Sequence, residues 1–250
     1  MAKGNNSKKG LNVKVVTVMM LMVLIVGCAI GGTVAWLLDK TENVTNTFST
    51  SDISITLDEG EMNPDGLTIN KDAERVTGDQ DFKMIPGWTI EKDPKVKVTT
   101  DSEDCYLFVK VEKTGGDVTV NGNNYTFDNF IAYAIQTDWT ELKEGTGVYY
   151  RVIDGSDDEH KKGKEYSILG AGTYSIGNTK YTWKKDQVLT KPEVTKEMMA
   201  AVKNLNQPKL SFTAYAVQLW KSNKPADSAT PEEKTAAQFT PDEAWAKISN

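Results

Sequence analysis

Histidine and cysteine are scarce in this 250-residue sequence, which contains one histidine and two cysteines. A zinc protease of the common type needs two histidines one helical turn apart, so that arrangement is excluded. A Ser-His-Asp or Cys-His catalytic group would have to use His160, and no Gly-x-Ser-x-Gly or cysteine-protease signature accompanies it. We therefore expect no enzymatic activity.

Phosphate-binding glycine loops and repeats are also missing. Gly170, Gly172 and Gly177 lack the lysine and the strand-to-helix setting of a nucleotide-binding loop. No repeat of about 20–50 residues and no low-complexity segment is present, which argues against solenoids and stalks.

The first 14 residues lack acidic side chains but contain four lysines, and residues 15–30 are almost entirely apolar. A basic region followed by an apolar region predicts an export signal over residues 1–35. Thr33 and Ala35 are small residues at the two positions that a signal peptidase reads. Cleavage near Ala35 is expected, which makes Trp36 the new N-terminus.

Two other fates of this segment stay open. Residues 15–38 are long enough to cross a hydrocarbon core of about 30 Å if they are not cleaved. Residues 25–28, Ile-Val-Gly-Cys, resemble the lipobox of bacterial lipoproteins, which would place a lipid on Cys28. The protein is thus expected to be secreted, lipidated or anchored, with membrane contact only through the N-terminal segment.

Charge and cysteine content restrict the mature protein further. Removing residues 1–35 changes the formal net charge from −6 to −10, because that segment holds four lysines and no acidic residue. An acidic surface disfavours binding to nucleic acid. Only Cys105 then remains, so no intramolecular disulfide can form. Cys105 lies on the apolar face of a predicted strand, which indicates a buried, inert thiol.

Residues 52–250 are predicted to form one all-β domain, a β-sandwich of the jelly-roll type with short helical insertions. Apolar and polar residues alternate along many short segments that are separated by turn residues, as expected for half-buried strands. The Asn121-Gly122 pair favours a tight hairpin turn. The clearest predicted strands are residues 53–57, 105–111, 148–153 and 210–218.

Three helices are predicted near the C-terminus. Residues 192–205 begin with a proline and carry an apolar stripe. Residues 231–237 and 241–248 each follow a Thr-Pro pair with acidic residues in the first turn. Ala244, Trp245 and Ile248 are expected to dock on the domain.

A loop after residue 153 contains several acidic side chains that could together bind calcium, which prefers oxygen ligands. Their spacing fits no EF-hand loop, and a solvated acidic turn is the favoured explanation. No other cofactor is expected. The candidate calcium ligands are Asp154, Asp157, Asp158 and Glu159.

Several segments resemble the TasA and camelysin family. The sequence Gly-Gly-Thr-Val-Ala-Trp-Leu-Leu-Asp at residues 31–39 is similar to the family's signal-peptide junction, and Asn-Thr-Phe at residues 46–48 precedes a first strand as in the family. The resemblance continues at residues 84–87 and 92–94 and in the strand 210–218. It is weaker over residues 115–191.

This resemblance implies a jelly-roll domain, a SipW-like signal peptidase as a partner, and export to the cell surface or biofilm matrix of a Gram-positive bacterium. It also implies a homo-oligomer or fibre, formed with copies of the same chain or related subunits. In such fibres the freed N-terminal segment of one subunit fills a strand position in the next.

Residues 36–51 are the candidate donor strand here, with Leu38, Val44 and Phe48 as pocket-filling side chains. An intramolecular strand or a flexible tether is the alternative for this segment. Camelysin is named as a surface metalloprotease, but a sequence with one histidine disfavours that activity. A membrane-tethered or lipidated binding domain is the other open function.

Overall fold

The computed structural model describes residues 38–41, 45–46, 53–78, 80–203 and 206–249. The chain divides into two compact units, Met1–Leu37 and Leu38–Asn250, and the described residues all belong to the second. The predicted export signal, with Cys28, Thr33 and Ala35, and the predicted new N-terminus Trp36 therefore lie outside the described residues.

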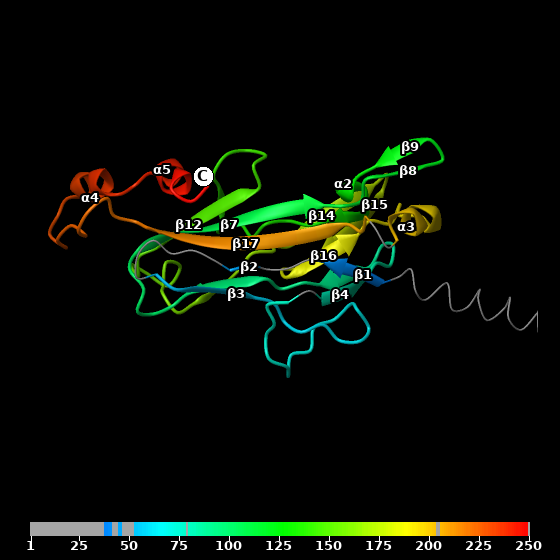
Figure 1. Cartoon of the computed structure of the whole chain (residues 1–250), viewed down its shortest axis with the longest axis horizontal. Helices are drawn as coiled ribbons and strands as arrows, with labels where there is room; N and C mark the ends of the chain where they lie inside the picture. Colours follow the sequence, from blue (N-terminus) through cyan, green and yellow to red (C-terminus); the bar gives the residue numbers. More distant parts are fainter. Residues whose placement is uncertain (1–37, 42–44, 47–52, 79, 204–205, 250) are drawn as a thin grey trace, which may run out of the picture. The chain divides into compact units, whose positions relative to one another are not determined.

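The second unit is an all-β structure with a few short helices, as the sequence predicts (Figure 1). Its helices are α2 (Phe127–Phe130), α3 (Lys196–Val202), α4 (Pro231–Ala237) and α5 (Pro241–Ala246). Its strands are β1 (Leu38–Thr41), β2 (Thr45–Asn46), β3 (Ile55–Asp58), β4 (Gln80–Lys83), β5 (Thr89–Glu91), β6 (Lys95–Val98), β7 (Cys105–Thr114), β8 (Val118–Val120), β9 (Asn123–Tyr125), β10 (Ile131–Ala132), β11 (Thr140–Glu141), β12 (Val148–Ile153), β13 (Glu165–Ser167), β14 (Gly172–Ile176), β15 (Thr179–Trp183), β16 (Gln187–Thr190) and β17 (Lys209–Gln218).

The largest sheet has the strand order β11-β12-β7-β17-β2. β7 and β17 pair antiparallel over ten residues, with Val109 opposite Ala214 and Leu107 opposite Ala216. These four side chains are fully buried. Successive side chains of a strand alternate between the two faces of a sheet, so these four side chains lie on one face. That face packs into the hydrophobic core.

The opposite face of the same sheet is covered by the C-terminal segment. Phe108 is fully buried there, and its ring lies 5.3 Å from that of Trp245 in α5. The Tyr215 ring lies 5.4 Å from Trp245 in an edge-on arrangement. The Tyr106 hydroxyl donates a hydrogen bond of 2.8 Å to the Phe239 carbonyl. The predicted docking of Ala244, Trp245 and Ile248 is confirmed.

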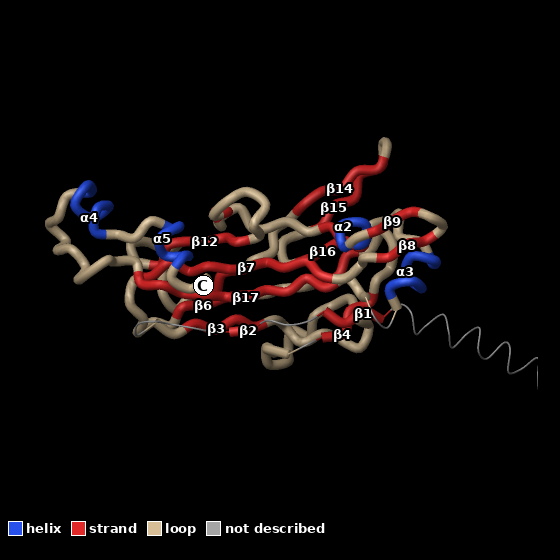
Figure 2. The backbone as a smooth tube through the Cα atoms, turned by 45° about the horizontal axis from the view of Figure 1, so that its top comes forward, coloured by secondary structure: helices blue, strands red, loops and turns tan. Residues whose placement is uncertain are grey.

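Five smaller sheets complete the unit, and Figure 2 shows their strands in red. β13-β6-β3 and β10-β16-β5 have three strands each, and β1-β4, β8-β9 and β14-β15 are two-stranded. The hairpin predicted at Asn121-Gly122 is confirmed, since both residues have positive φ angles, 50° and 80°. These angles match the tight turn that an Asn-Gly pair favours.

The helix predicted over residues 192–205 is shorter than expected. The structure begins α3 at Lys196, because the Thr195 side chain accepts a hydrogen bond from the Met198 backbone and acts as the N-cap. Pro192 lies in a preceding turn instead. The apolar stripe is correct, since Met198 and Val202 are buried.

Candidate functional site

The candidate site is the edge of the five-stranded sheet at β17, where the N-terminal segment joins the domain. β17 pairs with β7 along its whole length on one side. On its other side β2 pairs in parallel, with Thr45 opposite Thr213 and Asn46 opposite Ala214. Figure 1 shows β2 beside β17 and β3. This is the position of an added edge strand.

The same N-terminal segment makes a second pairing nearby. β1 pairs antiparallel with β4, with Leu38 opposite Lys83 and Thr41 opposite Gln80. Of the three predicted pocket fillers, Leu38 thus lies in β1, whereas Val44 and Phe48 lie outside the described residues. Within this chain, therefore, part of the segment 36–51 forms intramolecular strands, which is one of the three arrangements left open by the sequence.

Beneath this edge lies a buried ion pair. The Lys92 ammonium nitrogen is 2.9 Å from Glu59 Oε1, and the two side chains are only 4% and 6% exposed. The same nitrogen lies 4.6 Å from the Phe82 ring of β4 and 5.5 Å from the Phe212 ring of β17. Lys92 thus connects the β1-β4 pair to the strand that receives β2.

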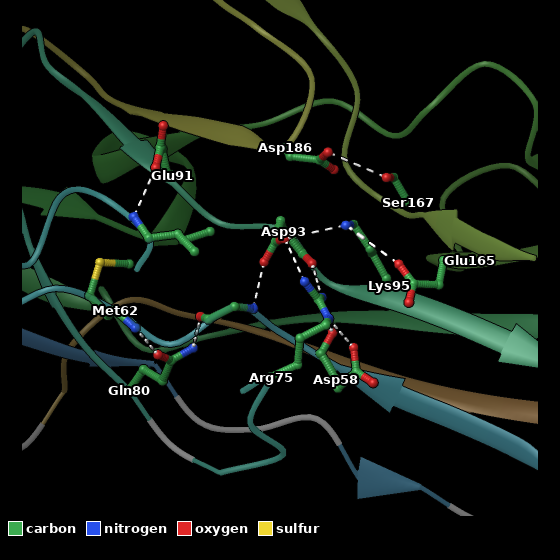
Figure 3. Close-up of polar contacts among 12 residues, drawn as sticks. Asp58, Met62, Arg75, Gln80, Glu91, Asp93, Lys95, Glu165, Ser167 and Asp186 are labelled. Carbon is green, nitrogen blue, oxygen red and sulfur yellow. Dashed lines mark hydrogen bonds and ion pairs between the residues drawn. The ribbon is translucent and has the colours of Figure 1, made fainter. Parts of the chain in front are cut away.

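A second polar group is centred on Arg75 (Figure 3). Its guanidinium hydrogen-bonds the carboxylates of Asp58 and Asp93, the latter at 2.7 Å, and their carbonyl oxygens at 3.0 and 2.8 Å. Arg75 therefore fastens the end of β3 to the residues before β6. No local sequence pattern indicates this role; the available signal is that the sequence contains only two arginines among its 29 basic residues.

The predicted calcium ligands lie in the loop after β12. Asp154 and Asp157 accept hydrogen bonds from backbone amides two residues ahead, at 2.9 and 2.7 Å. Asp158 faces Lys161 at 3.8 Å, and the Glu159 carbonyl accepts a hydrogen bond from Arg151. Among the described residues no three acidic, histidine or cysteine side chains are grouped so that they could hold a metal ion. Calcium binding stays a prediction.

The structure describes the environments of His160 and Cys105. His160 Nδ1 lies 2.8 Å from Asp157 Oδ1, a contact that lowers the pKa of the Asp157 carboxyl. Burial raises the pKa of the Cys105 thiol to about 12. A thiol with this pKa stays protonated at neutral pH, and the thiolate is the nucleophilic form.

No helix in the part of the chain that the structure describes has the length and apolar character needed to span a membrane. The chain matches none of the family models, curated proteins or solved structures with which it was compared.

Proposed function

We propose that this protein is an exported structural protein of the cell surface or biofilm matrix. In this proposal its domain is a jelly-roll sandwich, and its subunits assemble when the freed N-terminal segment of one copy pairs with the sheet edge of the next. The resemblance to the TasA and camelysin family and the predicted signal at residues 1–35 support export.

The observation that carries the assembly step is the parallel pairing of β2 with β17. β2 comes from the start of the domain and pairs with β17, its last strand, so the two paired strands are far apart in the sequence and no short loop joins them. An edge strand of this kind contributes main-chain hydrogen bonds, which an identical segment from another copy supplies equally well. Exchange of the segment therefore converts an intramolecular contact into an intermolecular one.

A cysteine pair tests this proposal directly. Thr45 and Thr213 are opposite each other in the parallel register, so Thr45→Cys with Thr213→Cys would lock the segment to its own chain on oxidation. We expect the oxidised chain beginning at Trp36 to remain monomeric by light scattering and electron microscopy, and the reduced chain to assemble. The two single-cysteine variants are the controls and should assemble in either state.

A second arm uses the isolated segment. A peptide of residues 36–51 should inhibit assembly, whereas a scrambled peptide of the same composition should not. If the locked chain assembles as readily as the reduced one, or if deletion of residues 36–51 leaves assembly unchanged, the strand-exchange proposal is wrong.

The alternative functions differ in what the mature protein retains. A lipidated or anchored binding domain would keep Cys28 or the whole apolar segment, and intact mass spectrometry of protein from its native host distinguishes these forms. A camelysin-like metalloprotease would show casein cleavage that chelators abolish. We propose that the protein is not an enzyme and expect no such cleavage.

A further inference from the structure

A cavity of about 600 Å³ opens beside Arg75 and its partner Asp93. This cavity has no part in the proposed assembly of subunits. Three segments line it: the loop between β3 and β4, the connection between β5 and β6, and the turn between β15 and β16. Its volume falls in the range of about 300–1,000 Å³ that is usual for small-ligand pockets.

The walls of this cavity are fixed by hydrogen bonds between the segments (Figure 3). Asp93 Oδ1 accepts a hydrogen bond of 2.6 Å from the Gly60 amide, and Glu91 Oε2 accepts one of 2.8 Å from the Ile69 amide. Arg75 adds its four contacts to Asp58 and Asp93. The cavity is therefore preorganised, which lowers the entropic cost of binding a ligand.

Asp186, in the turn after β15, is the least satisfied acid of the lining. Its Oδ2 accepts a hydrogen bond of 3.3 Å from the Ser167 hydroxyl, whereas Oδ1 is buried without a hydrogen-bond partner. Burial raises the pKa of this carboxyl. The other carboxylate oxygen of Glu91, Oε1, accepts no hydrogen bond from the residues that the structure describes. Both side chains can accept hydrogen bonds from ligand hydroxyl groups.

The exposed charges of the cavity lining are positive. Lys71, Lys184 and Lys185 are exposed, and none of them has an ion pair within the described residues. Lys95 faces Asp93 and Glu165 only at 3.7 and 3.6 Å. The lining has five basic and three acidic side chains, but two of the basic ones, Arg75 and Lys95, also pair with Asp58 and Glu165 just outside it. The three exposed lysines are therefore the groups that would attract an anion.

We propose that this cavity binds an anionic saccharide, a sugar unit that carries a carboxylate or a phosphate group. The lysines pair with the anionic group, and Glu91 and Asp186 accept hydrogen bonds from ring hydroxyls once the Asp186 carboxylate turns toward them. An anion without a sugar ring is disfavoured because it offers no set of ring hydroxyls that could reach these two acids while the lysines hold the charge. A ligand amine is disfavoured because the three exposed lysines of the lining would repel a positive charge.

Isothermal titration calorimetry on the full chain in a neutral detergent tests the proposal with four probes. Trigalacturonate carries the carboxylate, glucose 6-phosphate carries the phosphate, maltotriose is the neutral control, and inorganic phosphate is the bare anion. We expect one site per chain for at least one of the two anionic sugars. Maltotriose and inorganic phosphate should bind at least tenfold more weakly.

Two double variants with the same change of net charge separate the cavity from general electrostatics. Lys184→Gln with Lys185→Gln should weaken binding of the anionic sugar at least tenfold. Lys180→Gln with Lys196→Gln removes two exposed lysines that do not line the cavity, and it should leave the affinity within about twofold of the unmodified chain.

Asp186→Asn tests the role of the acid, because asparagine tolerates the positive φ angle of 60° at this position. Loss of the negative charge should improve binding of inorganic phosphate and reduce the preference for the sugar. The proposal fails if neither anionic sugar binds, if inorganic phosphate binds as tightly as the sugars, or if the Lys180/Lys196 variant loses as much affinity as the Lys184/Lys185 variant. None of these outcomes depends on strand exchange.

Discussion

Replacing Glu59 by glutamine should strongly destabilise the domain, because it leaves the Lys92 ammonium group buried without its counter-ion. Both side chains of this pair are almost inaccessible to water, and both carboxylate oxygens of Glu59 lie 2.9–3.0 Å from the Lys92 nitrogen. Removing one partner of a buried pair costs about 3–5 kcal/mol. The Phe82 and Phe212 rings near the ammonium offset only part of this loss, since a cation–π contact contributes about 2 kcal/mol when desolvated.

Urea unfolding of the chain beginning at Trp36, followed by fluorescence, measures the effect. With a denaturant slope of about 2 kcal/mol/M, a loss of about 3–5 kcal/mol lowers the midpoint by about 1.5–2.5 M. The double variant Glu59→Leu with Lys92→Met removes both charges and should recover most of the lost stability.

An exposed ion pair provides the matched control. Lys113 and Asp128 lie 2.8 Å apart, but their side chains are 39% and 62% exposed. Asp128→Asn should therefore change the free energy of unfolding by less than about 1 kcal/mol. If Glu59→Gln costs no more than this control, or if the double variant Glu59→Leu/Lys92→Met is as unstable as Glu59→Gln, the reasoning about burial is refuted.

Two further predictions concern the core and the C-terminal cover. In the chain beginning at Trp36, Cys105 is the only cysteine, and burial raises the pKa of its thiol to about 12. The thiol should therefore not react with a disulfide reagent at pH 8 until urea unfolds the domain. Fast reaction of the folded protein would contradict this prediction. Trp245→Ala removes the ring that packs on Phe108 and Tyr215, and it should lower the free energy of unfolding by about 2 kcal/mol. The control Trp88→Ala, at a residue that is 58% exposed, should lower it by less than about 0.5 kcal/mol. Equal losses of unfolding free energy in the two variants would show that α5 does not stabilise the sheet.

The strands with strict alternation could be predicted from sequence. Residues 148–153 form β12 as expected, and the expected strand 210–218 is β17 with one additional residue. In both segments the period of two comes from the burial of one face, so local sequence carries the information. Short strands such as β5 and β16 were not predicted, because three or four residues contain too little of that pattern.

The candidate sites depend on contacts between residues far apart in sequence, which local patterns do not encode. Thr45 pairs with Thr213, and Lys92 with Glu59, only once the sheets have formed. Lysine is rarely buried, so no sequence rule would place Lys92 in the core. Asp186 and Arg75 lie in segments that read as polar loops, and only the fold brings both to one cavity.

The two proposed interactions meet at β3, which directly follows the N-terminal segment in the sequence. β3 contacts β2, and its Asp58 is held by Arg75 at the cavity wall. β3 is also paired with β6, with Leu57 opposite Val96, and both of these side chains are fully buried. Release of β2 from β17 therefore removes two paired residues while β3 keeps its ladder and its arginine contact. Because the cavity walls do not include β1 or β2, a subunit that donates its N-terminal segment should bind the saccharide as well as one that does not.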